Sequence, residues 1–236
     1  MFAGCLILFN IFFIGCGLDT FYVIDPPSVY HEPLYSSMEL PERYFEFSTN
    51  EHDYEGTIKF LGTEVYYKIY NSSSKMNSEV SSINSAATNE TSTNQSANRL
   101  IETYKYQTLR HSNDEGANIL IPWNKNTNSR RVEIRLANDP EYDAEFTIAN
   151  NTLGYPVRNI LGNKVEDKSF SFKELSSANL PKGGDNGDAD YEYSSTTEEI
   201  KEYYVSMFAV SVAQDDKYSS VYSTAIYLGS VTIPLE

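Results

Sequence analysis

The sequence predicts an all-β protein built as a sandwich of two sheets, and three observations support this fold class. Several short segments alternate apolar and polar side chains with the two-residue period of a strand. Clusters of Pro, Asn, Asp and Gly separate these segments, as turns do. The 236 residues also include 19 Tyr and 12 Phe, which suit half-buried pleated surfaces. A chain of this length can bury a sizeable core, as one sandwich domain or two smaller ones.

The first segment, residues 1–15, is an uncharged apolar run that predicts a signal peptide. It is shorter than the roughly 20 residues that a membrane-spanning helix needs. The run ends in Phe13-Ile14-Gly15-Cys16, which resembles the lipobox of bacterial lipoproteins. This resemblance implies that Cys16 becomes the first residue of the mature protein and carries a covalent lipid. A plain signal peptide with a free Cys16, or a retained anchor helix, are the alternatives.

Cysteine usage favours lipidation. The chain has two cysteines, and Cys5 lies within the segment that cleavage would remove. Cys16 would then have no disulfide partner in an exported protein. Several acyl chains on one residue hold a protein firmly at a membrane, because each buried methylene contributes about 0.8 kcal/mol.

Residues 16–43 contain four prolines among Tyr and Ser and predict an extended, lipid-attached tether. A short strand at residues 21–24 is the most regular structure that we expect there. The sandwich domain is then expected to span residues 44–236.

The first clear strands are expected at residues 44–47 and 64–70. The second of these segments alternates strictly, with Val65, Tyr67 and Ile69 on one face and the polar or aromatic residues between them on the other.

Residues 71–115 form a polar, Ser- and Asn-rich insertion after this early strand. Met76, Val80 and Ile83 are spaced so that they would share one face of a short helix. A second helix is expected after Asn98, with apolar residues as far as Leu109. The alternative is a low-complexity loop, because Ser, Asn and Thr compete with helical hydrogen bonds.

The strand pattern returns after the insertion. We expect strands at residues 131–136, 144–148 and 169–172, with a turn at 138–140 between the first two. The runs at 202–213 and 218–233 predict a terminal hairpin.

Two of these strands carry a specific resemblance. Tyr203, Val205, Met207 and Ala209 follow the every-second-residue pattern of the penultimate strand of fibronectin type III domains, and residues 65–70 resemble the third strand of that family. The resemblance implies an immunoglobulin/fibronectin type III-like sandwich with a polar, partly helical insertion after an early strand.

The order of lipobox, Pro- and Tyr-rich tether, aromatic strands and Asn/Ser-rich insertion is similar to that of spirochaetal, treponemal-type lipoproteins of unassigned function. This resemblance implies a bacterial cell-envelope protein anchored by lipid at the periplasmic face or the cell surface. It implies no activity.

The charge balance argues against nucleic acid as a partner, because 33 Asp and Glu face only 18 Lys and Arg and the net charge is −15. The sequence shows no hydrolase elbow, phosphate-binding loop or paired histidine motif. Carboxylates that meet only in space, as in glycoside hydrolases, leave no such local signature.

One acidic, Gly-rich loop is a candidate for calcium binding. Asp185, Asp188, Asp190 and Glu192 are close together in the sequence, and Ca²⁺ takes six to eight oxygen ligands. A solvated acidic loop is the alternative interpretation.

Tyrosines that stand outward from strands are a second candidate, for a sugar or a protein ligand. Tyr66, Tyr70 and Tyr204 are the examples. Aromatic pairing within the sheets is the alternative. The sequence therefore predicts a non-enzymatic interaction or structural module without a cofactor. Its lipid would attach it to the membrane, and it would bind a protein partner in the envelope. A module that binds carbohydrate or protein, assisted by calcium, is the second hypothesis.

Overall fold

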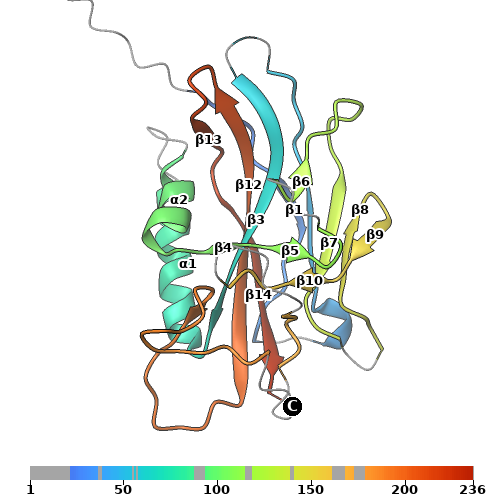
Figure 1. The fold of residues 1–236 in the computed structure, drawn as a ribbon. Coiled ribbons are helices and arrows are strands. Elements are labelled where there is room, and N and C mark those ends of the chain that lie inside the picture. The colour runs from blue at the N-terminus through green and yellow to red at the C-terminus, as the bar shows by residue number, and fades with distance from the viewer. Residues whose placement is uncertain are drawn as a thin grey trace, which may run out of the picture.

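The computed structural model describes residues 22–36, 39–54, 56, 58–87, 94–114, 119–138, 141–160, 168–172 and 179–235. Two sheets pack face to face, and a helical layer covers the outer face of the second sheet (Figure 1). The predicted β-sandwich character is confirmed at this level. The predicted signal peptide, the lipobox and Cys16 lie outside the described residues. Within the described part, no helix is long and apolar enough to cross a membrane.

The first sheet has five antiparallel strands. Their order across the sheet is β1 (Ser28–His31), β2 (Phe45–Ser48), β7 (Arg131–Arg135), β8 (Glu145–Ile148) and β9 (Asn151–Gly154). The strands predicted at 44–47, 131–136 and 144–148 are thus confirmed as β2, β7 and β8. The turn between β8 and β9 has positive φ at Ala149 and Asn150, a backbone typical of tight hairpins.

The second sheet is centred on two long strands. β3 (Ile58–Tyr70) and β12 (Glu202–Asp215) pair antiparallel along almost their whole length. On its other side, β12 pairs first with β14 (Ile226–Pro234) and then with β13 (Ser220–Tyr222). Short segments that pair with β3 are β4 (Gln107–Thr108), β6 (Ile121–Pro122) and the parallel β11 (Tyr191–Glu192). A separate small pair joins β5 (Arg110–His111) to β10 (Pro156–Val157).

The predicted terminal hairpin is confirmed, but its second arm is broken into β13 and β14. The break lies at Ser223, whose hydroxyl accepts a hydrogen bond from Ser211 N at 2.9 Å. The backbone N–H of Ser223 donates to Ser211 O. A side-chain oxygen therefore replaces one rung of the ladder at this point.

The main core lies between the two sheets. The faces of β3 and β12 predicted to point inward do so: Val65, Tyr67 and Ile69 meet Val205 and Ala209 there. From the first sheet, β2, β7 and β8 contribute aromatic and branched side chains, namely Phe45, Phe47, Val132, Ile134, Phe146 and Ile148.

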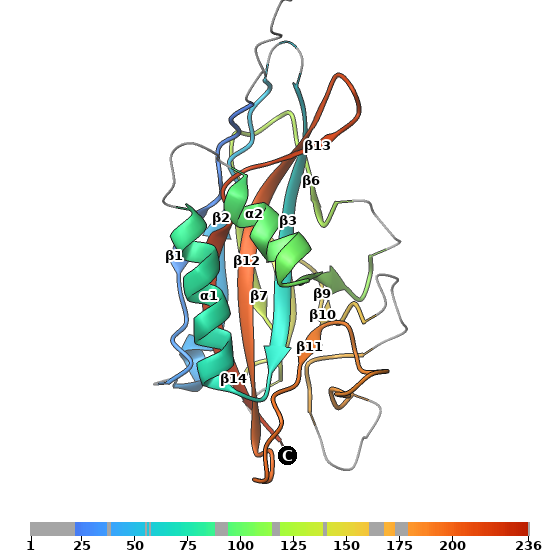
Figure 2. The same ribbon diagram turned by 90° about the vertical axis from the view of Figure 1, so that its left-hand side faces the viewer.

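The polar insertion forms two helices, which confirms the helical interpretation over the loop. They are α1 (Ser73–Ala87) and α2 (Gln95–Asn98), and α2 continues into a π-helical turn at Arg99–Thr103. Figure 2 shows α1 and α2 lying across the outer face of β3 and β12. Met76, Val80 and Ile83 face the sheet as their spacing predicts. The expected turn between the helices falls largely at residues 88–93, outside the described part.

The second helix ends earlier than predicted. Lys105 has a φ of 55°, and Tyr106 N donates to Leu100 O, a bond pattern that closes helix C-termini. The chain then crosses β3, and Leu109 enters the core between the sheets. The prediction that Leu109 belongs to the helix was therefore wrong.

The first strand also differs from the prediction. Residues 22–24 form no strand; Ile24 instead packs against Phe60 and Ala213 at one end of the molecule. Residues 28–31, in the segment expected as a tether, form β1 of the first sheet. Pro33 lies against Gly229 of β14, where a Cβ would come within 2.6 Å of the proline ring.

No strand forms at residues 169–172. Phe170 and Phe172 are nonetheless buried, with their rings 5.0 Å from Tyr67 and 4.9 Å from Tyr203, respectively. Phe170 and Phe172 alternate with serines because both rings insert side by side into the core. The backbone of this segment has no hydrogen-bonded neighbour strand in the described part of the chain. A pattern of alternating burial cannot distinguish these two arrangements.

Candidate functional site

The acidic loop predicted to bind calcium folds around an internal arginine. Arg158 is fully buried, and its Nη2 lies 2.9 Å from Asp188 Oδ2 and 2.7 Å from Asp190 Oδ1. Its Nε donates to Asp190 Oδ2 at 2.8 Å, and the Tyr67 hydroxyl donates to the same oxygen at 2.7 Å. Burial opposes the charge of Arg158, but the hydrogen bonds and charge of Asp190 hold its pKa above the ordinary value.

The four candidate calcium ligands do not form one cluster. Asp185 is exposed, whereas Glu192 lies 2.8 Å from Lys68 Nζ and belongs to another network. Across the described residues, no three acidic, His or Cys side chains are grouped so that they could hold a metal ion. A cation at Asp188 and Asp190 would have to displace Arg158, which already supplies their charge and hydrogen bonds.

A second polar network lies beneath the helices, on the opposite face of β3. Lys68 Nζ lies 3.2 Å from Glu79 Oε2 and donates to Tyr104 O at 2.8 Å. The hydroxyl of Tyr70 lies 2.8 Å from the same Glu79 oxygen and 2.9 Å from the hydroxyl of Tyr106. The network thus connects α1, the turn after α2 and β3. It ties the helical layer to the sheet.

Tyr66 and Tyr70 lie on the outer face of the second sheet, as expected, but both rings are buried under the helical layer. Burial raises the pKa of both hydroxyls, and neither ring offers a free face to a sugar. The sequence did predict helices here. It did not indicate which sheet face they would cover.

Tyr204 is the one candidate tyrosine that borders open space. It is half-buried near the start of β12 and lines three adjoining hollows of about 640, 300 and 310 Å³. Its ring meets the ring of Tyr35 edge-on, with centroids 5.5 Å apart. Burial, followed by the hydrogen bond and charge of Glu202, raises the pKa of Tyr204 to about 12, so the hydroxyl stays protonated at neutral pH.

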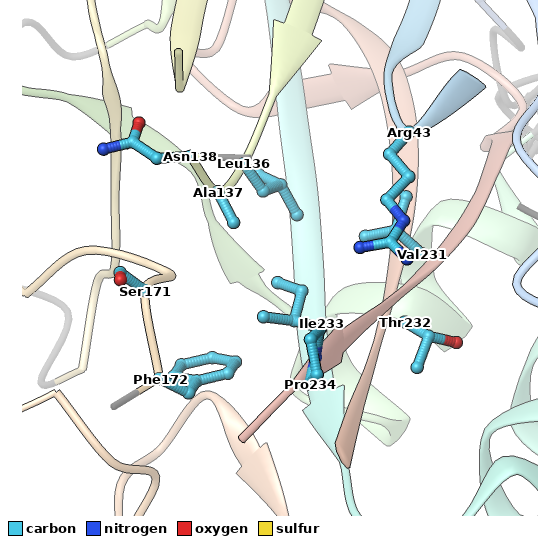
Figure 3. A pocket seen from close by; sticks show the side chains of 10 residues that line it. All are labelled: Arg43, Leu136, Ala137, Asn138, Ser171, Phe172, Val231, Thr232, Ile233 and Pro234. Atoms are coloured by element: carbon cyan, nitrogen blue, oxygen red, sulfur yellow. The ribbon is translucent and has the colours of Figure 1, made fainter. Parts of the chain in front are cut away.

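Two further hollows adjoin this region at the ends of β7 and β14. The first is a crevice of about 30 Å³, which holds roughly one water molecule. Figure 3 shows Leu136, Phe172 and Ile233 around it, with Arg43 and Asn138 at opposite sides. The second, of about 410 Å³, shares Asn138 with the crevice and extends to Tyr155.

Shared residues connect these hollows into one surface, which we call the distal rim. Arg43 and Thr232 line both the crevice and one hollow at Tyr204, and Asn71 lines the other two hollows at Tyr204. The residues that define the distal rim are Tyr35, Arg43, Asn71, Asn138, Thr196, Glu202, Tyr204 and Thr232.

The buried acids are paired with cations. Every buried carboxylate of the described residues lies within ion-pair distance of an Arg or Lys, and none of these acids lines the five hollows: Glu46, Glu51, Glu64, Glu79, Asp114, Asp188 and Asp190. The arrangement therefore suits internal cross-linking of the layers. The distal rim offers aromatic, amide and hydroxyl groups together with the charged side chains of Arg43 and Glu202, and such groups suit contact with a ligand.

Sequence reasoning missed most of these partners. No local spacing marks Arg158, Lys68 or Glu79 as the buried members of charge networks. Lys75 and Glu79 are four residues apart on α1, which is a recognised pairing distance, but that spacing equally describes an exposed helix face.

Comparison of the chain with protein-family models, with curated proteins and with solved structures found no match.

Proposed function

We propose that this protein is a lipid-anchored component of a bacterial cell envelope and acts as a non-enzymatic interaction or structural module. In this proposal, the lipid on Cys16 holds the molecule at the membrane and the distal rim contacts a protein partner. The observation that carries it is the position of the rim at the opposite end of the sandwich from Ile24.

The geometry supports this arrangement. Ile24 packs against Phe60 near the start of β3, whereas Asn71 of the distal rim follows the end of that strand. A strand of 13 residues is about 40 Å long. Cys16 precedes Tyr22 by six residues, which can span at most about 20 Å. An anchored molecule would therefore direct the distal rim away from the membrane (Figure 1).

The character of the surfaces supports contact over catalysis. A general acid or base acts from a cleft, where it can reach a substrate. The paired carboxylates described above lie inside the protein. The hollows of the rim are lined by Tyr, Asn, Thr and Ser side chains and by charged residues, namely Arg43, Glu198, Glu199, Lys201 and Glu202. Such side chains suit the polar edge of a protein interface.

We also propose that the sandwich is of the immunoglobulin/fibronectin type III kind. In that architecture the third, sixth and seventh strands are neighbours in one sheet, and the first, second and fifth strands are neighbours in the other. The order β3–β12–β14 supports the proposal, because the third strand pairs with β12, the first of the two long strands that end the chain. In the first sheet β1 and β2 are neighbours as the rule requires, but β7, which pairs with β2, is the fourth strand of the chain and not the fifth when the two-residue strands are set aside.

Site-specific photocrosslinking in intact cells tests the proposed interaction. A photoreactive phenylalanine analogue replaces Tyr204 in one variant and Ser81, on the exposed side of α1, in the control. We expect a discrete adduct with a partner protein at position 204 and none at position 81. Equal labelling at both positions, or none at either, would contradict the assignment of the distal rim as the contact surface.

Carbohydrate binding is the second candidate, favoured by the position of Tyr204 between three hollows with amide and hydroxyl neighbours. A glycan array read with the native protein and with Tyr204→Ala tests it, and binding that disappears in the variant supports it. Calcium assistance at Asp188 and Asp190 would require the ion to displace Arg158, which already binds both carboxylates.

A further inference from the structure

An exposed tyrosine marks the turn between β12 and β13, at the end of the molecule opposite the distal rim. The side chain of Tyr218 is 82% exposed, the largest exposed fraction among the large hydrophobic residues of the described part. Its backbone has a φ of 66°, a left-handed conformation that is strained for a bulky residue. A strained, exposed aromatic residue at a loop tip suggests selection for something other than stability.

The turn holds this ring in a defined position. Asp215 Oδ1 accepts hydrogen bonds from Lys217 N at 2.9 Å and from Ser219 N at 2.7 Å. The backbone of Asp215 also bonds to both Tyr218 and Ser219. Asp215 satisfies the turn from within, and Asp216, Lys217 and Tyr218 are exposed at its tip, followed by the exposed Ser219 and Ser220.

The tip lies at the end where the described chain begins. Ile24 shares a small apolar cluster with Ala213 near the end of β12 and with Val221 on β13. Val23, its neighbour, is 61% exposed. Figure 1 and Figure 2 both show the β12–β13 turn and the first described residues at the same end of the molecule.

We propose that the β12–β13 turn rests on the lipid bilayer beside the anchor, with Tyr218 at the headgroup level. This inference rests on the proposed lipidation of Cys16, whose distance limit of about 20 Å from Tyr22 keeps this end close to the membrane. Tyrosine favours the interface between water and hydrocarbon, where its ring is apolar and its hydroxyl stays hydrated. Lys217 beside it supplies a cation for a lipid phosphate.

Two features identify a neutral bilayer surface as the occupant. The chain carries a net charge of −15, which opposes association with strongly anionic lipid. The exposed groups at the tip are one ring and one residue of each charge, so attraction by charge alone is weak there. The ring of Tyr218, held near the bilayer by the lipid anchor, can contact the membrane interface without a net positive patch on the protein.

A fluorophore at the tip tests the proposal. The full-length protein is produced with its lipid, and an environment-sensitive dye is attached to Asp216→Cys, which leaves Tyr218 in place. A second variant carries the dye at Tyr193→Cys, an exposed position next to β11 at the other end. Each is reconstituted into phosphatidylcholine vesicles. We expect quenching by aqueous iodide to be about threefold weaker at position 216 than at 193, because interfacial groups are shielded from water.

The matched control adds Tyr218→Asn to the Asp216→Cys variant. Asn tolerates the left-handed backbone, so the turn survives while the ring is lost, and we expect most of the shielding to disappear. Mass spectrometry of the same sample reports the state of Cys16. Lipidated protein with equal quenching at 216 and 193 would overturn the tip contact alone. A bare Cys16 would overturn both the contact and the anchoring from which it was inferred.

Discussion

Arg158 has no exposed surface, yet it carries a positive charge in the centre of a chain rich in acids. The charge is stable there because Asp188 and Asp190 surround the guanidinium and Tyr67 completes the hydrogen bonds. Such a cluster connects β3 to the loop before β11. Its residues are separated in sequence by up to 123 positions, so no local pattern could predict it.

Replacement of this arginine should therefore be far more damaging than loss of a surface charge. We expect Arg158→Met to lower the free energy of unfolding by about 3–5 kcal/mol, because two buried carboxylates lose their cation. Lys105→Met, which removes an exposed pair with Glu102, should change stability by less than about 1 kcal/mol. Urea denaturation of both variants checks this, and similar small losses would contradict the proposed role of Arg158.

Glu64 predicts a specific pH dependence. Burial raises its pKa from 4.5 to about 7, although Arg110 and the backbone N–H of Leu120 oppose the shift. Between pH 4.5 and about pH 7, Glu64 keeps its proton in the folded protein and releases it in the unfolded chain. The stabilisation is fully present below pH 4.5 and is lost as the pH rises through 7. The total loss is about 3 kcal/mol.

The Glu64→Gln variant isolates this effect, since an amide can occupy the same site without titrating. Unfolding free energies of the two proteins, measured by denaturant titration from pH 4.5 to 8, should diverge as the pH rises. The native protein should lose stability relative to the variant. Parallel curves would exclude a raised pKa at Glu64.

At the scale of elements, the sequence predicted best where apolar periodicity and burial agree. The inward faces of β3 and β12 and the apolar face of α1 follow their sequence patterns, because apolar side chains recur at the strand or helix period on each face that packs into a core. The pattern failed at 169–172, where the side chains are buried but the backbone is unpaired. It also failed at Leu109, because Lys105 ends the helix through a backbone conformation that its side chain does not signal.

The candidate site was less predictable than the fold. Tyr204 alone, of the three tyrosines, borders a hollow, because the helices of the insertion that follows β3 cover the sheet face that carries the other two. Whether that face is buried depends on which sheet the helical insertion packs against, and only the tertiary structure determines this. The acidic loop was recognised, but its arginine partner was not.

Packing of α1 against the sheet can be tested at its apolar face. Ile83 is fully buried there, so Ile83→Ala should lower the free energy of unfolding by about 2–4 kcal/mol. Ser81→Ala lies on the exposed side of the same helix and should leave stability within about 0.5 kcal/mol. Equal effects of the two substitutions in chemical denaturation would show that the helix does not cover β3 and β12 as described.

For the molecule as a whole, the two-sheet core is the feature on which everything else depends. Val205 and Ala209 of β12 are fully buried between the sheets. Val205→Asp or Ala209→Asp should abolish cooperative thermal unfolding, because an unpaired carboxylate there costs several kcal/mol. Lys201→Asp, exposed just before the same strand, is the control and should unfold near the native temperature. Normal melting of either core variant would refute the strand assignment.

The whole molecule also has two distinct ends. One gathers Ile24, the β12–β13 turn and the exposed Tyr218, whereas the other carries the distal rim. Under the proposed function, this polarity would keep one end at the membrane and direct the other end toward a partner. The proposal for each end therefore depends on attachment at the N-terminal side.

The most direct test of this account is the mass of the N-terminal peptide of protein isolated from cell envelopes. We predict that it begins at Cys16 and carries two or three acyl chains. A peptide that retains residues 1–15, or one that begins at an unmodified Cys16, would contradict the proposed anchoring and the orientation derived from it.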